Sequence, residues 1–514
     1  MEEWANEAKV NSQSKRMEIS HEMLNLEERQ CITVSNILEQ KNPDTQVRML
    51  CLDGGGVKGI IETNTLEYMH FCLQQFTKGY SVTQTFDALN DFINEKGENV
   101  TYTYDPNGAP KMYKMFDVMV GTSMGAIISV AMARLHMSPN ELKKEVLEIA
   151  TEIFPPNNFW NVPGHFARLL CAGFRDGRHR YSERPLEDYL KEQLKDHSWS
   201  GNYNDPHFGI VATKAHDSSV HIFNSKQYNK SDTVEIWQAI RASTAAPVYF
   251  PSFCIEDDMT SENVEYIDGG LGANCPVSYA MHMLEENDTL SVLVSIGVGD
   301  SNPSNLPIAR AFQHARNGEE EWEKFRASRG THKSRTMHRL APSISSGLGK
   351  YRMSDSSKVE EMQNVYRDWL KSSDSNWYRI ELVSASASLF AKSLSVLEAT
   401  ADTTSTGYKL KLKIHVKFDE SIHYGECYID NGYFYPGTDT GETESEFKIH
   451  IKLSDNPIIL NGLYEKPDNN GELIHIKFNN FEIAGSPMKI KKKFELRPKK
   501  FSLPSRRPRN ASLL

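Results

Sequence analysis

The sequence contains no run of apolar residues long enough to cross a membrane as a helix. Its longest uncharged apolar stretch, residues 118–133, has 16 residues and includes two glycines, whereas a membrane-spanning helix needs about 20 apolar residues. The N-terminus also lacks the basic start and the apolar core of a secretory signal. We therefore expect a cytoplasmic protein that could meet a membrane only at its surface.

Cysteine is scarce and never clustered. The 514 residues include seven cysteines, and none of them has the spacing of a zinc site. This usage is typical of a reduced, intracellular protein. Residues 105–108 begin like a calcium-binding loop, but no glutamate follows at the spacing that such a loop requires. The sequence thus predicts neither a metal site nor a cofactor.

Basic residues are too few to give the chain a positive balance. Lys and Arg number 58 against 68 Asp and Glu, a formal net charge of −10, which argues against a general nucleic-acid-binding protein. The exception is the C-terminal end, where residues 489–514 carry ten Lys and Arg against one Glu. For the basic tail, residues 495–514, three roles stay open: contact with anionic membrane lipids, a nuclear or RNA-directed signal, and a disordered solubilising end.

What the sequence does contain is the composition of an ordinary globular protein, with 39% apolar and 25% charged residues. We divide it into a polar and partly helical arm, an α/β domain, a short linker, a small β-domain and the basic tail. The predicted bounds are 1–47, 48–400, 401–407, 408–494 and 495–514. A stretch rich in Ser, Ala and Thr, residues 384–407, marks the change from α/β to β patterns.

Alternating strand and helix patterns identify the second part as an α/β domain. Residues 47–52 form an apolar strand pattern, which a glycine turn and a helical pattern follow at once. A second strand, turn and helix unit occupies residues 116–135. Further strand patterns follow at residues 208–212, 220–223, 264–267 and 290–296. We predict a mostly parallel central sheet covered by helices on both faces, which is a three-layer α/β/α sandwich.

Beyond residue 407 the apolar residues no longer recur at helical spacing but at every second position. Leu410, Leu412 and Ile414 alternate with lysines, and similar alternation returns downstream. This is the pattern of half-buried antiparallel strands, so we predict a small all-β sandwich with an immunoglobulin-like fold. Residues 470–487 resemble the end of a filamin-type immunoglobulin repeat, a module that binds partner proteins or pairs chains.

Gly121-Thr-Ser-Met-Gly125 has the spacing of a nucleophile elbow, G-x-S-x-G. Such an elbow places a serine at a sharp turn between a strand and a helix, where its hydroxyl is presented above the sheet. The flanking patterns predict that strand and that helix. Ser123 is therefore a candidate nucleophile, with a merely structural turn as the alternative.

Asp53-Gly-Gly-Gly-Val-Lys-Gly59 joins the first strand pattern to the first helix. Consecutive glycines let backbone N–H groups converge on an anion, either a phosphate or the oxyanion of an acyl transfer. A P-loop ends in Gly-Lys followed by Ser or Thr, whereas here Lys58 precedes Gly59 and Ile60 follows, so this loop is not a P-loop. The G-x-G-x-x-G spacing from Gly54 keeps a dinucleotide site open, although the acidic residue expected near position 75 is missing. A tight turn without function is the remaining alternative.

Asp268-Gly-Gly270 follows another strand pattern. An aspartate before two glycines is most often a turn residue. Beside a serine nucleophile it becomes a candidate base, since a serine hydroxyl needs a proton acceptor before it attacks. The rival bases, which would make a Ser–His–Asp hydrolase, are the histidines that follow in the order of an α/β-hydrolase triad: His282, His314, His332 and His338.

The three glycine motifs, in this order, resemble those of the patatin-like phospholipases, a family that includes plant patatins and the calcium-independent phospholipases A2. Residues 241–250 are similar to the family's segment before the aspartate, residues 274–276 to the segment after it, and residues 377–380 to a late family strand. The resemblance covers about residues 48–400. One departure is Cys275, where the family usually has a second asparagine.

The resemblance implies a patatin-type α/β/α fold and a Ser–Asp dyad that uses neither histidine nor calcium. Ser123 would attack the ester carbonyl, and Asp268 would act first as general base and then as general acid. The implied oxyanion hole consists of the N–H groups of Gly54, Gly55 and Gly56. The residues implied to support these motifs are Lys58, Gly59, Gly121, Met124, Gly125, Gly269 and Gly270.

The implied activity is that of a phospholipase A, which cleaves fatty acyl esters of phospholipids through an acyl-enzyme at a membrane or lipid-droplet surface. Two alternatives stay open: an acyltransferase that passes the acyl group to a lipid alcohol, and a lipid-binding scaffold with a silent catalytic centre. The β-domain could add a protein partner and the basic tail an anionic membrane contact.

Overall fold

The computed structural model describes residues 45–394 except 79, 96–109, 155–180, 203, 229–233, 248, 257–262, 300–317 and 330–335, and it describes strands between residues 394 and 489. The predicted arm up to residue 44, the basic tail and the loop 105–108 lie outside the described residues. Within the described part, no helix is both long enough and apolar enough to cross a membrane.

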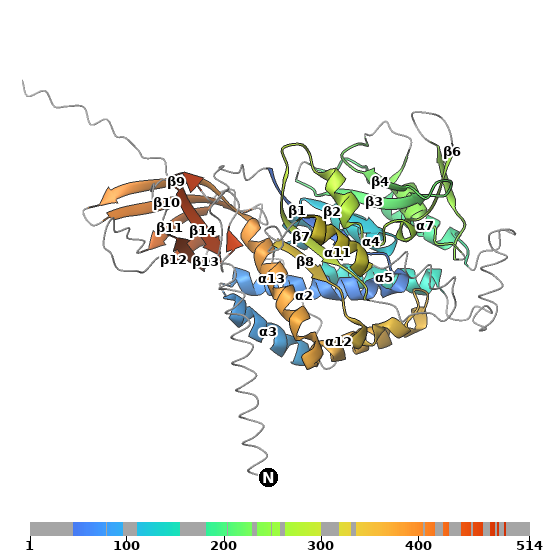
Figure 1. The fold of residues 1–514 in the computed structure, drawn as a ribbon, viewed down its shortest axis with the longest axis horizontal. Coiled ribbons are helices and arrows are strands. Elements are labelled where there is room, and N and C mark those ends of the chain that lie inside the picture. Colours follow the sequence, from blue (N-terminus) through green and yellow to red (C-terminus); the bar gives the residue numbers. More distant parts are fainter. Residues whose placement is uncertain are drawn as a thin grey trace, which may run out of the picture.

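The first sheet has eight strands in the order β5-β6-β3-β2-β1-β7-β8, with β4 paired to β3 (Figure 1). Strands β1, β2, β3, β7 and β8 pair in parallel, whereas β4, β5 and β6 pair antiparallel. The sheet is therefore mixed: its strands β3, β2, β1, β7 and β8 are parallel, as predicted for most of the sheet, and β4, β5 and β6 add an antiparallel part. The antiparallel pairs β3–β4 and β5–β6 follow from short connections, which leave no room for a parallel crossover. The bounds are β1 (Gln46–Leu52), β2 (Val118–Thr122), β3 (His207–Lys214), β4 (Val220–Asn224), β5 (Phe253–Glu256), β6 (Asn263–Asp268), β7 (Thr289–Ile296) and β8 (Met337–Leu340).

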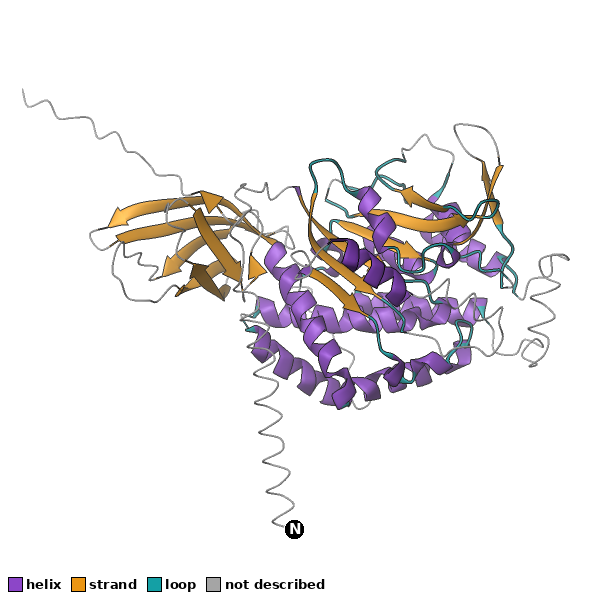
Figure 2. Cartoon of the chain, viewed as in Figure 1, coloured by secondary structure: helices purple, strands orange, loops and turns teal. Residues whose placement is uncertain are grey.

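Helices cover both faces of this sheet (Figure 2). On β1, Leu50 and Leu52 join the larger apolar core, and Met49 and Cys51 join the smaller core on the opposite face. The predicted α/β fold is confirmed for the described residues. The larger core is covered by α2 (Gly59–Thr77), α3 (Val82–Glu95), α4 (Met124–Leu135), α5 (Pro139–Ile153), α7 (Arg184–Leu194), α8 (Ile236–Ser243), α12 (Val359–Lys371) and α13 (Asn376–Lys392). The smaller core is covered by α9 (Val277–Ala280) and α11 (Gly318–Arg329).

Helix α13 corrects two predictions. Residues 377–380, which resemble a family strand, form the start of this helix. The Ser- and Ala-rich stretch from residue 384 is its buried second half and not a domain boundary. Small side chains let α13 pack closely against α2 and β8, and the Ser386 hydroxyl donates to the Leu382 carbonyl at 2.8 Å. A serine that is satisfied within its own helix is compatible with a buried helical position.

After α13 the chain forms a second sheet, in which all strand pairs are antiparallel and β9 to β14 each pair with the next strand along the chain. Strand β9 (Leu394–Thr404) includes residues 401–404 of the predicted linker and forms a hairpin with β10 (Gly407–Val416). The immunoglobulin-like sandwich and its filamin-type end stay predictions. The other strands are β11 (Gly425–Asp430), β12 (Glu444–Leu453), β13 (Asn456–Glu465), β14 (Leu473–Phe478), β15 (Phe481–Glu482) and β16 (Met488–Lys489), the last of which pairs with β14.

Candidate active site

Ser123 occupies a sharp turn between β2 and α4. Its φ is 53°, a left-handed value that non-glycine residues rarely adopt. A Cβ atom on Gly121 would lie 2.1 Å from the Gly125 carbonyl oxygen, and one on Gly125 would lie 2.5 Å from the Leu52 carbonyl oxygen. Gly121 is therefore required because the start of α4 lies directly against it, and Gly125 because it lies against the end of β1. The predicted strand, glycine turn and helix are all present.

The structure brings Ser123 and Asp268 together. The Ser123 hydroxyl donates to Asp268 Oδ2 at 2.9 Å, and the Gly270 N–H donates to Asp268 Oδ1 at 2.7 Å. Asp268 ends strand β6, and only 2% of it is exposed, against 5% of Ser123. Gly269 lies against β3, since a Cβ atom there would be 2.1 Å from the Val211 carbonyl oxygen. One carboxylate oxygen is thus held by the backbone while the other faces the serine.

The glycine loop connects β1 to α2 and contains a residue with positive φ, Gly56 at 57°. The Gly54 N–H donates to the Asn274 carbonyl at 3.2 Å, so this donor of the predicted oxyanion hole is already engaged. Among the described residues, the N–H groups of Gly55 and Gly56 have no hydrogen-bond partner. These two remain as the donors that the loop can offer. Lys58 is buried at the end of the short 3₁₀ turn.

The loop also packs tightly against its surroundings. A Cβ atom on Gly56 would lie 2.3 Å from the Met353 carbonyl oxygen, and one on Gly59 would lie 2.4 Å from Met124 Cγ. The Val57 N–H donates to the same Met353 carbonyl at 2.9 Å. Gly59 and Met124 therefore join the start of α2 to the start of α4, beside the nucleophile elbow.

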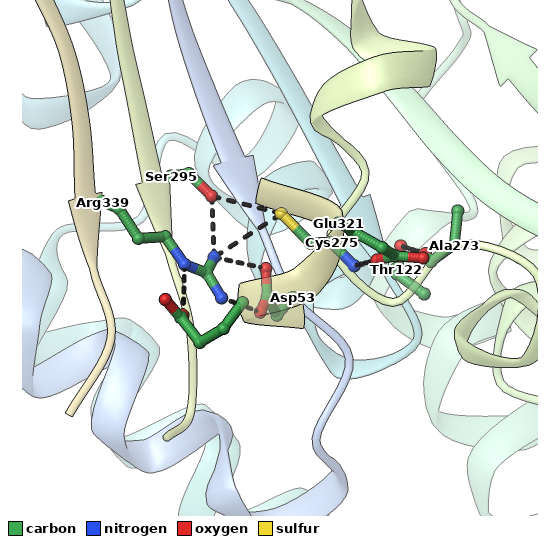
Figure 3. A network of polar contacts seen from close by, with 8 residues as sticks. Asp53, Thr122, Ala273, Cys275, Ser295, Glu321 and Arg339 are labelled. Atoms are coloured by element: carbon green, nitrogen blue, oxygen red, sulfur yellow. Dashed lines mark hydrogen bonds and ion pairs between the residues drawn. The ribbon is translucent and has the colours of Figure 1, made fainter. Parts of the chain in front are cut away.

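A buried ion pair anchors the first residue of the loop. Arg339 of β8 donates two hydrogen bonds to Asp53, Nη1 to Oδ1 at 2.9 Å and Nη2 to Oδ2 at 2.7 Å (Figure 3). It also donates to Ser295 Oγ and to Glu319 Oε1, both at 2.8 Å. Burial disfavours the charged guanidinium, but the groups around it, with Asp53 foremost and Cys275 and Glu319 beside it, together raise the pKa of Arg339 well above its ordinary value. Arg339 could not be recognised from the sequence, because 286 positions separate the partners and no local motif joins them.

Glu321 of α11 supports the segment 273–275, whose middle residue accepts the loop N–H. Its Oε2 accepts the Cys275 N–H at 2.6 Å, and Thr122 donates to the Ala273 carbonyl at 2.9 Å (Figure 3). Burial raises the pKa of Glu321 to about 7. The segment therefore links the glycine loop to the end of β2, and the sequence offered no signal for Glu321.

A largely apolar cavity of about 400 Å³, its open mouth included, lies beside the dyad. Ser123, Asp268 and Gly56 belong to its lining, so the three predicted motifs face one space. Such walls suit a hydrocarbon chain, whereas the phosphates of a dinucleotide would meet the Asp268 carboxylate. The rest of the lining is Met124, Ile127, Ile149, Ile153, Phe154, Leu186, Thr244, Ala246, Tyr249, Phe250 and Met353.

The histidines predicted as rival bases do not reach Ser123 where the structure describes them. His338 bonds through Nδ1 to Glu381 at 2.8 Å and through Nε2 to Ser388 at 2.9 Å. His282 is exposed, and His314 and His332 lie outside the described residues. In the described part of the chain, no three His, Cys, Asp or Glu side chains are grouped as metal ligands.

Comparisons with known proteins find relatives over about half of this chain. Residues 50–281 match the family model of the patatin-like phospholipases. The calcium-independent phospholipase A2-gamma of Oryctolagus cuniculus is 25% identical over 270 residues, which are 49% of this chain and 28% of that protein. The 85/88 kDa calcium-independent phospholipase A2 of Rattus norvegicus is 24% identical over 286 residues, covering 49% of this chain and 27% of that protein. The cGAMP-activated phospholipase of Vibrio cholerae is 23% identical over 251 residues, covering 48% and 59%. The chain thus spans less than a third of the length of the first two relatives.

Proposed function

We propose that this chain, which contains a patatin-like phospholipase domain at residues 50–281, is a lipid acyl hydrolase of the phospholipase A type. The observation that carries the proposal is the 2.9 Å hydrogen bond from Ser123 to Asp268, made at a glycine-flanked elbow beside an apolar cavity. Neither Ser123 nor Asp268 alone would support a hydrolase. Together they supply a nucleophile, its base and a space for an acyl chain.

In the proposed first step, Ser123 Oγ attacks the ester carbonyl carbon and its proton passes to Asp268 Oδ2. A serine hydroxyl is a weak nucleophile unless a neighbouring base takes its proton. The Gly270 N–H bond to Oδ1 fixes the carboxylate, so that Oδ2 is the oxygen available to the serine. Burial of both side chains keeps bulk water away from this proton transfer.

The negative charge that develops on the carbonyl oxygen needs backbone donors. Gly55 and Gly56 are the proposed donors, since the Gly54 N–H is bonded to the Asn274 carbonyl. Each well-placed donor lowers such a barrier by roughly 3 kcal/mol. The acyl chain would lie in the apolar cavity, and Asp268 would return the proton to the leaving alcohol.

Water then attacks the acyl-enzyme, with Asp268 again as base, and releases the fatty acid. A lipid alcohol in place of water would make the same centre a transacylase. The proposed substrate is a phospholipid or another lipid ester at a membrane or droplet surface, which agrees with the apolar cavity. A cytoplasmic or peripheral location remains part of the prediction.

The test is release of fatty acid from phosphatidylcholine vesicles and triolein emulsions in EDTA. Wild type is compared with Ser123→Ala, Asp268→Ala and the control Ser388→Ala, which removes a buried serine hydroxyl outside the cavity lining. We expect release by wild type and Ser388→Ala only, with phosphatidylcholine products that distinguish sn-1 from sn-2 cleavage. Acyl transfer to added monoacylglycerol without free fatty acid would favour the transacylase. No release by wild type, or undiminished release by Ser123→Ala, would overturn the proposal.

A further inference from the structure

We infer that Ser243 is a positioning residue for the nucleophile and that the segment 243–245 sets the separation of Ser123 and Asp268. The inference rests on the proposed function, because it concerns how that dyad is held. It concerns a residue that makes no contact with the reacting atoms and belongs to none of the three glycine motifs.

The Ser243 hydroxyl connects the nucleophile backbone to the central sheet. Its Oγ accepts the Ser123 N–H at 2.9 Å and donates to the Val211 carbonyl of β3 at 2.6 Å. A hydroxyl has a single proton. Because that proton is directed to Val211, the lone pairs of the oxygen are directed to Ser123. Ser243 is 0% exposed, so water cannot take over either bond.

The residue two positions later holds the base. The Asp268 N–H donates to the Ala245 carbonyl at 2.9 Å. One short segment therefore contacts the backbone of both members of the dyad, through Ser243 on one side and Ala245 on the other. The two backbones cannot separate without breaking one of these bonds.

The elbow needs such support because its backbone is strained. A non-glycine residue with positive φ, such as Ser123, costs of order 1–3 kcal/mol and persists only when its surroundings hold it there. An N–H buried without a partner costs a further 1–3 kcal/mol or so. The bond from Ser123 to Ser243 satisfies the N–H in the strained conformation, so its loss would favour a relaxed turn with a displaced hydroxyl.

The segment is itself firmly attached. Arg241, 1% exposed at its side chain, donates to Glu187 of α7 at 3.1 Å and to the Pro251 carbonyl at 3.0 Å. The Thr244 hydroxyl donates to the Ile240 carbonyl at 3.0 Å. These bonds fix the end of α8 to α7 and to the following loop, so the segment 243–245 can hold Ser123 and Asp268 at a constant separation.

A matched control exists in the same domain. Ser225 is 4% exposed, and its hydroxyl accepts the Phe208 N–H of β3 at 2.9 Å. It is therefore a second buried serine that satisfies a backbone N–H at the same distance, but it does not line the cavity. Ser225→Ala removes the same atoms as Ser243→Ala without touching the elbow.

The experiment compares the full chain with Ser243→Ala and Ser225→Ala in three assays: hydrolysis of a short-chain p-nitrophenyl ester, covalent labelling by a fluorophosphonate probe, and thermal unfolding. We expect Ser243→Ala to lower kcat and the labelling rate by about 10²-fold with KM nearly unchanged. Ser225→Ala should retain wild-type kcat while both variants lose similar amounts of Tm. Wild-type kcat in Ser243→Ala, or an equal loss in both variants, would overturn the inference.

Failure of the proposed function would look different. If wild type neither hydrolyses the ester nor reacts with the probe, the hydrolase proposal fails, and hydrogen exchange then decides the positioning role. The peptide that contains Ser123 should exchange faster in Ser243→Ala and at the wild-type rate in Ser225→Ala. Unchanged exchange in Ser243→Ala would reject the positioning role whatever the activity.

Discussion

Two buried serines in this domain belong to hydrogen-bonded groups that include an acidic side chain. The two serines differ in backbone conformation and in access to a cavity. Ser123 bonds to Asp268, whereas Ser388 bonds to His338, which in turn bonds to Glu381. By side-chain content, the second set is closer to a serine-hydrolase triad. Yet Ser388 lies within a helix, is 1% exposed, and donates to the Ala385 carbonyl of its own helix at 3.0 Å.

What sets the Ser123 region apart is its backbone and its access to the cavity. Ser123 sits at a strained turn and lines an apolar cavity together with Gly56, whose N–H has no hydrogen-bond partner among the described residues. The Ser388 region has none of these features among the described residues. The comparison teaches that a list of side chains is a weak indicator of catalysis, and that backbone donors and access are the stronger ones.

Strand β8 separates the two regions. His338 and Arg339 are consecutive, and successive side chains of a strand point to opposite faces of the sheet. His338 bonds to two residues of α13, and Arg339 bonds to Asp53 at the start of the glycine loop. The same strand therefore supplies one constellation that stabilises the fold and one that supports the site.

The largest expected effect tests whether Ser123 and not Ser388 is the nucleophile. Asp268→Asn should lower kcat by about 10⁴-fold, the upper end of what a general base contributes, because the amide cannot take the Ser123 proton. His338→Gln should keep kcat within about two-fold, since His338 bonds to Glu381 and Ser388 and to neither Ser123 nor Asp268. Ester hydrolysis by the two purified variants checks both. Equal losses of activity would make the His338 constellation part of the mechanism.

The next effect concerns stability on the two faces of β8. Arg339→Met leaves the buried Asp53 carboxylate without its partner and should lower the free energy of unfolding by about 3–5 kcal/mol. His338→Gln should cost less, about 1 kcal/mol, because its partner Glu381 is one-third exposed at 33%.

Urea unfolding of both variants measures this difference. The double variant Asp53→Leu with Arg339→Met removes both charges and should recover most of the loss, since an apolar pair can replace a buried ion pair. If the double variant is no more stable than Arg339→Met, the cost does not come from an unpaired charge.

The glycine loop can be tested against another glycine with positive φ. Gly56→Ala should lower kcat by about 10²-fold or more, because its Cβ would lie 2.3 Å from the Met353 carbonyl oxygen and displace a proposed oxyanion donor. Gly347, with φ of 73°, has its nearest neighbour at 3.7 Å. Gly347→Ala therefore meets only the φ penalty and should keep its kcat. Comparable losses of kcat in both variants would assign the effect to backbone strain alone.

The catalytic candidates could be predicted from the sequence because their signals are local. A strand, a glycine turn and a helix occupy residues 116–135 around Ser123, and Asp268 precedes two glycines. The supports of the site could not be predicted in the same way. Arg339 and Ser243 meet their partners across 286 and 120 positions, and only the folded sheet brings them together.

Local signals also misled where tertiary packing decides the outcome. The N–H of Gly54 is taken by Asn274, a contact that the glycine motif does not reveal. The serines and alanines of residues 384–388 have the composition of a linker, but their small size is what lets α13 pack against α2 and β8. Strands β4, β5 and β6 make the sheet mixed because their connections are short, which the apolar pattern alone does not indicate.

The smallest expected effect is a pH dependence of the free energy of unfolding that comes from Glu321, a residue that supports the Ser123 region. Burial raises the pKa of Glu321 to about 7, whereas in the unfolded chain it lies near 4.3. Between these values the folded chain binds a proton that the unfolded chain has released, so the free energy of unfolding falls as pH rises from about 4.5 to about 7 and then levels. The contribution is of order 1–3 kcal/mol, since one pKa unit corresponds to about 1.4 kcal/mol and the side chain is not fully enclosed.

Glu321→Gln removes the titration but keeps an oxygen that can accept the Cys275 N–H. Its stability should therefore fall less than that of wild type between pH 5 and pH 7.5 in urea unfolding. Glu323→Gln, at an exposed position of the same helix, is the control and should follow the wild-type slope. If Glu321→Gln also follows the wild-type slope, the carboxyl of Glu321 titrates in its ordinary range. The segment 273–275 would then be held by the Thr122 bond, and the Glu321 contact would contribute little to the glycine loop that distinguishes Ser123 from Ser388.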